Sequence, residues 1–437
     1  MPQTATFDHD APPVPGAAEL LKALRAGHLP VQEHAEACLA RIAARDGDIR
    51  AWSHVDPALV RSEAARLDRL PPEARGPLHG LAIGVKDVIL TADMPTRYNS
   101  PGHSGLARGT DADCVAILRA QGALILGKCD TVEFAAMGRR AATRNPHDTG
   151  RTPGGSSSGS GAAVADGQVP VTLGTQTGGS VIRPAAFCGT AAMKPSWGAV
   201  SSEGMKRYSV SLDTLGFYGR AVADLRPLAQ AYDLPGQGEL PRRHLRLAVA
   251  RTEAEALVQP EMRAAFDATL ERLAEVADLT DLDWPEALQD LRETHDVVMR
   301  GEGLAGFRAE ALRQGAALHP EFHARLLSRP YSLNELRMAQ DRAALARIAF
   351  DALAGKVDAV VTYSALGAAP LGLASTGSAD CNRIWTLLHA PVVNLPLPRP
   401  DGALPLGLSV TGARYTDLQV LAVAERIEAA LAPGAQP

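Results

Sequence analysis

The chain has 437 residues, of which 46% are hydrophobic, so it can bury a large core and is typical of globular rather than disordered proteins. Its formal net charge is −5 with both signs interspersed, and aromatic residues make up 4%, which argues against nucleic-acid and membrane-surface partners. Five widely spaced cysteines without a CxxC pair indicate a reducing compartment and disfavour disulfides or structural zinc.

The predicted elements begin after an acidic, proline-containing start that lacks the apolar segment of a signal peptide, so a cytoplasmic protein is expected. Residues 17–70 are predicted to be helical, because apolar positions recur every three or four residues. Short apolar runs then alternate with helical patterns, which predicts an α/β fold with a mixed, mostly parallel central sheet covered by helices on both faces. The expected strands are 81–90, 123–127, 169–175, 245–250, 358–363, 391–396 and 406–412, and the expected helices are 111–122, 182–189 and 416–431.

A long stretch from about 255 to 355 is almost wholly helical in pattern, including a run from Leu333 to Leu353. It fits a lid or helical flank over a site, and equally one covering face of the sheet. The sequence carries no signature that separates these arrangements.

Two short motifs resemble known binding or catalytic patterns but lack the context those patterns need. Residues 122–129, GALILGKC, have P-loop spacing except at Cys129, yet the middle residues form a strand rather than a glycine-rich turn. Residues 155–159, GSSSG, fit G-x-S-x-G with Ser157 as nucleophile, yet a loop precedes them instead of a strand. The twelve histidines show no paired ligand spacing, so no metal and no cofactor are predicted.

The most informative stretch runs from Arg151 to Gly189 and holds two Gly/Ser clusters, at 156–160 and 178–180, without a histidine. Such clusters suggest backbone N–H groups directed at a developing negative charge, beside a hydroxyl that could attack. The base that such chemistry needs is predicted upstream at Lys86, inside an apolar strand. A buried lysine can lose its proton near neutral pH and act as a base.

Ser156 follows two glycines, and Ser180 follows residues 177–179, whose N–H groups could converge near its oxygen. Taken singly, each serine fits a helix N-cap and Lys86 fits a salt-bridged lysine at a strand end. Their joint occurrence favours a hydroxyl nucleophile served by a lysine.

The segments GVKDV, NPHDTGRTPGGSSSGS and GTQTGGSVIRPAAFCGTAAMKPSWGAVS resemble the amidase signature family, the serine amidases with a Ser–cisSer–Lys triad. The likeness covers most of the chain after about residue 76. It implies cleavage of a carboxylic amide, and by extension an ester or carbamate, through an acyl-enzyme on Ser180. In this resemblance Ser156, preceded by a cis peptide bond, relays protons to Lys86, and the N–H groups of Thr177, Gly178 and Gly179 form the oxyanion hole.

Further residues are candidates for substrate binding by the same resemblance. Arg183 resembles the arginine of malonamidase-like members that can hold a substrate carboxylate; the alternative is a structural arginine tying the helix start to the sheet. Gln176 and Ser157 could add hydrogen bonds, and Asn382 lies in a segment that often borders the pocket, although packing explains it equally well. The expected partner is a small-molecule amide, with no nucleic acid and no membrane, and a homodimer is left open.

The expected organisation has an N-terminal helical segment at 1–75, an amidase-signature core at 76–235, and residues 236–437 as the C-terminal part of the same domain. Two other functions compete with hydrolysis. One is an amidotransferase component that delivers ammonia to a partner, and the other is an inactive binding module with the same fold.

Overall fold

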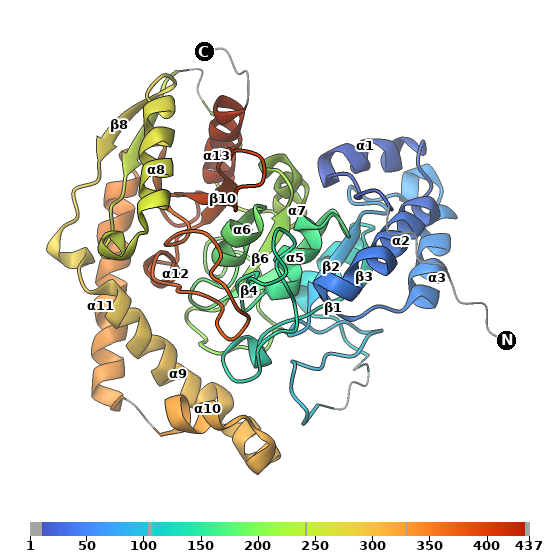
Figure 1. Ribbon diagram of the computed structural model, residues 1–437, viewed down its shortest axis with the longest axis horizontal. Coiled ribbons are helices and arrows are strands. Elements are labelled where there is room, and N and C mark those ends of the chain that lie inside the picture. Colours follow the sequence, from blue (N-terminus) through green and yellow to red (C-terminus); the bar gives the residue numbers. More distant parts are fainter. Residues whose placement is uncertain (1–10, 104–106, 108, 241–242, 329–330, 433–437) are drawn as a thin grey trace.

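One large sheet organises the fold (Figure 1). A computed structural model describes residues 11–103, 107, 109–240, 243–328 and 331–432. The strand order is β1–β3–β2–β4–β6–β5–β10–β11–β9–β7–β8. The strands are β1 Trp52–His54, β2 Ala82–Lys86, β3 Leu124–Cys129, β4 Val171–Gln176, β5 Ala191–Lys194, β6 Thr214–Gly219, β7 Leu245–Val249, β8 Ala277–Asp281, β9 Ala359–Tyr363, β10 Val392–Pro396 and β11 Gly407–Thr411.

Strand pairing confirms the α/β class but corrects the expected predominance of parallel strands. In the described residues, β2–β3, β2–β4, β7–β8 and β7–β9 are parallel, while the other six pairings are antiparallel. Three of the six antiparallel pairings involve β5 and β6, which the sequence pattern does not predict, and two more join the predicted strands β9, β10 and β11, whose relative direction the pattern does not show. All the pairings of these two strands are antiparallel, including those with β4 and β10.

Helices cover both faces of the sheet. The α-helices are α1 Ala17–Ala26, α2 Val31–Ile49, α3 Pro57–Asp68, α4 Asp113–Ala120, α5 Ser158–Ala165, α6 Ile182–Cys188, α7 Arg226–Ala231, α8 Pro260–Leu273, α9 Leu291–Gln314, α10 Pro320–Phe322, α11 Leu333–Ala354, α12 Arg383–Leu387 and α13 Asp417–Leu431. The long helices α9 and α11 pack side by side at one end of the molecule (Figure 1). The stretch 255–355 is therefore largely helical as expected, except that β8 interrupts it at the edge of the sheet.

Two hydrophobic cores lie on opposite faces of the sheet. In β3, Leu124 and Leu126 belong to one core, whereas Ile125 between them belongs to the other. This alternation follows from the two-residue period of a strand, and it shows that both faces are buried. Helices α4, α8 and α13 pack on the face of Ile125, and α2, α5, α6 and α11 pack on the face of Leu124.

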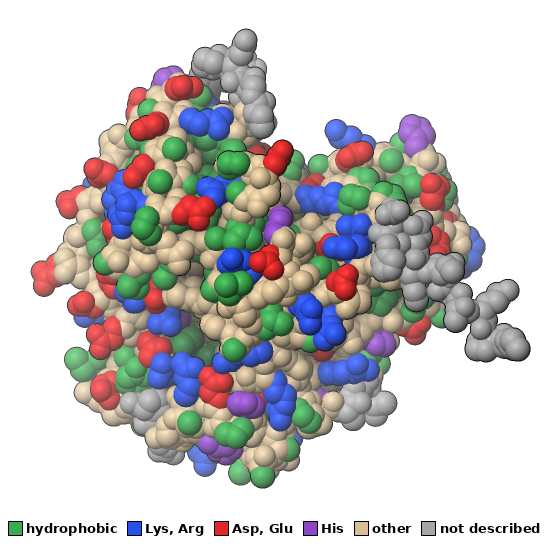
Figure 2. Space-filling model, viewed as in Figure 1, with side chains coloured by type: hydrophobic (Ala, Val, Ile, Leu, Met, Phe, Trp, Pro, Cys, Tyr) green, Lys and Arg blue, Asp and Glu red, His purple; other side chains and the backbone are tan. Residues whose placement is uncertain are grey.

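The state of the cysteines and the distribution of surface charge can be compared with what the composition suggests. All five cysteines are buried free thiols. Figure 2 shows positive and negative side chains interspersed over the visible face. No helix in the described part of the chain is both long and apolar enough to cross a membrane.

Candidate active site

Lys86 is the last residue of β2 and is completely buried. Its Nζ lies 2.9 Å from Ser156 Oγ, 2.8 Å from Thr175 Oγ1 and 3.3 Å from the Thr175 carbonyl oxygen. Burial lowers the pKa of Lys86 well below its usual value, and the nearby charge of Asp213 opposes this shift only in part. The amine is therefore positioned as a proton acceptor in contact with a hydroxyl, not as a salt-bridged lysine.

Ser156 lies in the loop before α5, after a cis peptide bond from Gly155. The N-cap of α5 is Ser157, so the N-cap alternative does not apply to Ser156. The Ser156 carbonyl accepts hydrogen bonds from Thr131 Oγ1 at 2.9 Å and from the Val132 N–H at 3.2 Å. These contacts fix the main chain while the side chain reaches Lys86.

Ser180 lies in the turn between β4 and α6 and is 9% exposed, on the wall of a cavity of about 260 Å³. Val181 is the N-cap of α6, so Ser180 is not a cap either. The main-chain N–H groups of Gly178, Gly179 and Ser180 donate to no atom of the described residues. Three successive free donors beside a hydroxyl are suited to binding an oxyanion. The N–H of Thr177, the first member of the set predicted from sequence, likewise donates to no atom of the described residues, and the Ser180 N–H extends that set.

The two predicted catalytic serines are neighbours through the main chain. The Ser157 N–H donates to the Ser180 carbonyl at 3.3 Å. Within the described residues no hydrogen bond joins the Ser156 and Ser180 hydroxyls. Catalytic hydrogen bonds are commonly long in the absence of substrate and tighten when it binds.

Asp213 is a buried carboxylate beside this turn that sequence reasoning did not single out. It accepts hydrogen bonds from Thr177 Oγ1, from the Tyr208 N–H, and from the Ser209 N–H at 3.0 Å. Burial raises its pKa to about 6 despite these bonds. The sequence feature that could have pointed to Asp213 is its position in SLDTLG, residues 211–216, a segment that resembles the amidase signature family only weakly.

The candidate substrate-binding residues divide into one that lines the cavity and three that do not. Gln176 accepts from the Val181 and Ile182 N–H groups, and Ser157 Oγ contacts the Thr175 carbonyl at 3.2 Å. Asn382 donates a hydrogen bond of 2.9 Å to the Ser364 carbonyl. It also packs against Gly179, because a Cβ added to Gly179 would lie 3.1 Å from the Cβ of Asn382. The polar groups of all three side chains thus bind main-chain atoms of the protein.

Arg183 lines the cavity, but its guanidinium is already engaged by protein oxygens. It donates to the Gly155 carbonyl, to the Gly377 carbonyl at 2.9 Å and to Thr376 Oγ1 at 3.2 Å. Burial lowers its pKa to about 10. These bonds tie the loop before Ser156 to residues 376–377 and not to the sheet, so the structural role differs from the one considered from sequence. A contact with substrate stays a prediction.

The cavity wall is rich in arginine. Its lining includes one carboxylate, Glu321, against five guanidinium groups, those of Arg140, Arg183, Arg300, Arg325 and Arg383. Arg300 contacts Asp296 through Nε alone, and Arg325 contacts Glu321 through Nη1 at 2.7 Å, so both retain unpaired N–H donors within the described structure. Helix α9 supplies His295, Met299 and Arg300, so the helical stretch forms one wall of the site.

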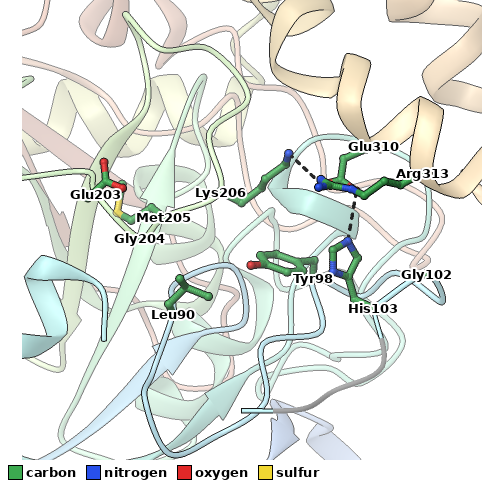
Figure 3. A pocket seen from close by; sticks show the side chains of 10 residues that line it. All are labelled: Leu90, Tyr98, Gly102, His103, Glu203, Gly204, Met205, Lys206, Glu310 and Arg313. Atoms are coloured by element: carbon green, nitrogen blue, oxygen red, sulfur yellow. Dashed lines mark hydrogen bonds and ion pairs between the residues drawn. The ribbon is translucent and has the colours of Figure 1, made fainter. Parts of the chain in front are cut away.

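A second cavity, of about 510 Å³, lies beside α9 near its C-terminal end (Figure 3). At its wall Glu310 lies between Lys206 and His103, at 3.2 Å from each. Its lining includes no serine, threonine or cysteine among the described residues. The cavity is thus unsuited to nucleophilic catalysis by a hydroxyl or thiol, unlike the cavity that Ser180 lines.

Comparison with known proteins gives a consistent result. Residues 33–421 match the family model described as Amidase. A glutamyl-tRNA(Gln) amidotransferase subunit of Chloroflexus aggregans (strain MD-66 / DSM 9485) is 34% identical over 92% of this chain and 93% of its own length. A crystal structure of an amidase has a TM-score of 0.86 at 29% identity, covering 96% of this chain and 100% of that chain. The peptide amidase from Stenotrophomonas maltophilia has a TM-score of 0.80 at 26% identity, covering 95% of this chain and 96% of that chain.

Proposed function

This chain belongs to the Amidase family, and on that premise we propose that it cleaves the C–N bond of a carboxylic amide through an acyl-enzyme on Ser180. The observation that carries the proposal is the contact of 2.9 Å between a buried Lys86 amine and the Ser156 hydroxyl, next to free N–H donors around Ser180. A buried neutral amine, a relay hydroxyl and an oxyanion site are the parts that such chemistry requires.

The reaction begins when Ser180 Oγ attacks the amide carbonyl. Its proton passes to Ser156 Oγ while the Ser156 proton passes to the Lys86 amine. The N–H groups of Gly178, Gly179 and Ser180 hold the oxyanion of the tetrahedral intermediate. The proton then returns through Ser156 to the leaving nitrogen, the C–N bond breaks and an ester on Ser180 remains. Water hydrolyses this ester by the reverse relay, which releases the carboxylic acid and restores both hydroxyls.

The substrate class follows from the size and charge of the cavity. A volume of about 260 Å³ lies just below the usual range of roughly 300–1,000 Å³ for small-molecule sites, so a small amide fits. The excess of guanidinium groups over carboxylates on the wall favours an acyl group that carries a carboxylate, because arginine binds carboxylates through paired N–H donors.

Arg300→Gln is expected to lower kcat/KM for an amide with a second carboxylate by about 10- to 100-fold, the equivalent of one charge-assisted hydrogen bond. A neutral amide of the same size should lose only a few-fold. Arg183→Ala is the comparison: equal losses for both substrates would leave Arg183 the structural bonds to Gly155, Thr376 and Gly377, whereas a larger loss for the acidic amide would support its predicted contact with substrate. Equal losses in Arg300→Gln would assign that arginine to structure instead.

A second candidate function is that of an amidotransferase component, which would release ammonia from glutamine and pass it to an acceptor held by a partner. It is favoured by the likeness to glutamyl-tRNA(Gln) amidotransferase subunits over nearly the full length of both chains. The acyl-enzyme step is the same in both functions. They differ in the fate of the ammonia and in the need for a partner.

The purified chain alone is expected to release ammonia from a small amide and to react at Ser180 with a serine-reactive fluorophosphonate. A coupled ammonia assay over a panel of small, aryl, acidic and carbamate substrates, with glutamine included, measures the first outcome. Labelling without turnover of any substrate would favour the amidotransferase role. Folded protein that shows neither labelling nor turnover would favour the inactive binding module.

A further inference from the structure

Two successive carbonyl groups before Ser180 are held by side chains from distant parts of the chain. The Thr177 carbonyl lies 2.8 Å from His295 Nε2, which comes from α9. The Gly178 carbonyl accepts a hydrogen bond of 2.8 Å from Thr386 Oγ1, which comes from α12. In a trans peptide unit the C=O and N–H bonds point in opposite directions. Each of these bonds therefore turns the next N–H, of Gly178 or Gly179, away from the helix that holds the carbonyl.

The tautomer of His295 is fixed by the atom that its ring contacts. A carbonyl oxygen can only accept, so Nε2 carries the proton and donates to Thr177. The side chain is fully buried, and burial lowers its pKa to about 4, which leaves the imidazole neutral at physiological pH. Nδ1 is buried and has no hydrogen-bond partner in the described residues.

This arrangement argues against a role for His295 as a general base. Its Nε2 is occupied by the main chain, and its Nδ1 is enclosed by protein atoms and inaccessible. The ring lies against the Gly178 main chain, since a Cβ placed on Gly178 would be 3.7 Å from its Cε1. What the imidazole can do is hold the peptide unit between Thr177 and Gly178 in one orientation.

We propose that His295 is a positioning residue for the oxyanion site: its bond to the Thr177 carbonyl keeps the Gly178 N–H directed at the oxyanion formed on attack by Ser180. The inference rests on the proposed amide cleavage. It makes helix α9, which belongs to the helical stretch without a readable motif, part of the apparatus that binds the transition state. Because the donor acts mainly on the charge that develops during reaction, its loss should appear in kcat rather than in KM.

The test is a series at one position, His295→Leu, His295→Asn and His295→Gln, with kcat and KM measured on the best amide substrate. A glutamine amide nitrogen reaches the place of Nε2, whereas the shorter asparagine does not. We expect kcat to fall about 10- to 100-fold in the leucine and asparagine variants with KM changed less than about threefold, and to recover largely in the glutamine variant.

His389→Leu is the matched control. His389 is also buried and contacts a main-chain carbonyl, that of Ser211, at 2.7 Å, away from the cavity. It reports the structural cost of losing such a bond and should leave kcat unchanged. If His295→Leu does not fold, the ratio of the glutamine to the asparagine variant decides.

A kcat within twofold of wild type in His295→Asn, or no recovery in His295→Gln, would overturn the proposal. Failure of the proposed function looks different, because then the wild-type protein itself turns over no amide, whether or not it labels at Ser180.

Discussion

Ser180→Ala is expected to abolish amide turnover, with kcat reduced by about 10⁴-fold or more, while the protein stays folded. Removal of the hydroxyl removes the only atom of this residue that can form the acyl-enzyme. The hydroxyl has no hydrogen-bond partner in the described residues, so the free energy of unfolding should change by no more than about 0.5 kcal/mol. Steady-state kinetics and urea unfolding measure the two quantities separately.

Ser160→Ala is a suitable control from the same serine-rich segment. Ser160 is fully buried, but its Oγ donates to the Leu173 carbonyl at 2.8 Å and it does not line the cavity. This variant should lose stability, by about 1 kcal/mol, and keep its activity. If Ser180→Ala retained turnover, the nucleophile would lie elsewhere, and Ser157 would be tested next.

Lys86→Met is expected to lower kcat/KM by about 100-fold or more, the contribution of a general base. Methionine fills the volume of the lysine stem without a proton acceptor, so the loss reports the amine and not a cavity. In the wild-type enzyme the neutral amine is needed. Because burial lowers the pKa of Lys86, activity persists above that pKa and is lost as the pH falls through it. The buried carboxylate of Asp213, with a pKa of about 6, is the charged group that bears on this titration.

Lys128→Met provides the comparison, because Lys128 is also fully buried, on the neighbouring strand β3. Its Nζ donates to the Ile89 carbonyl and to Thr96 Oγ1, both at 2.6 Å, and touches no serine. That variant should be less stable but keep the loss of kcat/KM at low pH. A wild-type profile that stays flat down to pH 5 would count against a lysine base.

The sheet shows where sequence patterns predict structure and where they do not. The apolar runs of β2, β3 and β4 are long enough to identify strands buried on both faces. Strand β6 is missed because Gly216 and Gly219 weaken the strand pattern. Gly216 is required by its neighbours, since a Cβ there would lie 2.7 Å from Val181 Cγ2. Such a close approach arises from the tertiary structure and cannot be read from the local sequence. Strand β8 is missed because it is a polar edge strand with mostly exposed residues.

The residues of the candidate site likewise divide into those that the sequence predicts and those that only the fold reveals. The Gly/Ser segments and the apolar run around the lysine indicate Lys86, Ser156 and Ser180, because unusual local composition marks them. The residues that complete the cavity, such as His295 and Arg300, lie on an ordinary amphipathic helix more than a hundred residues away. Helical periodicity indicates a buried face but does not say what that face is buried against. Their role becomes visible only once the chain is folded.

The order of the strands has a consequence for biosynthesis. Strands β1–β6 form one contiguous part of the sheet, whereas in the described structure β7, β8 and β9 are joined to it through β10 and β11. On the ribosome, strands β7, β8 and β9 therefore have no strand of the central sheet to pair with until residues 392–411 have emerged. A nascent chain halted before then already contains Lys86, Ser156 and Ser180, but the strands that flank α9 and α11 are not yet joined to the sheet that carries the site, and α9 supplies the bond to the Thr177 carbonyl. Catalytic competence would therefore arrive late in translation, so that incomplete chains would carry a reactive serine without the means to use it.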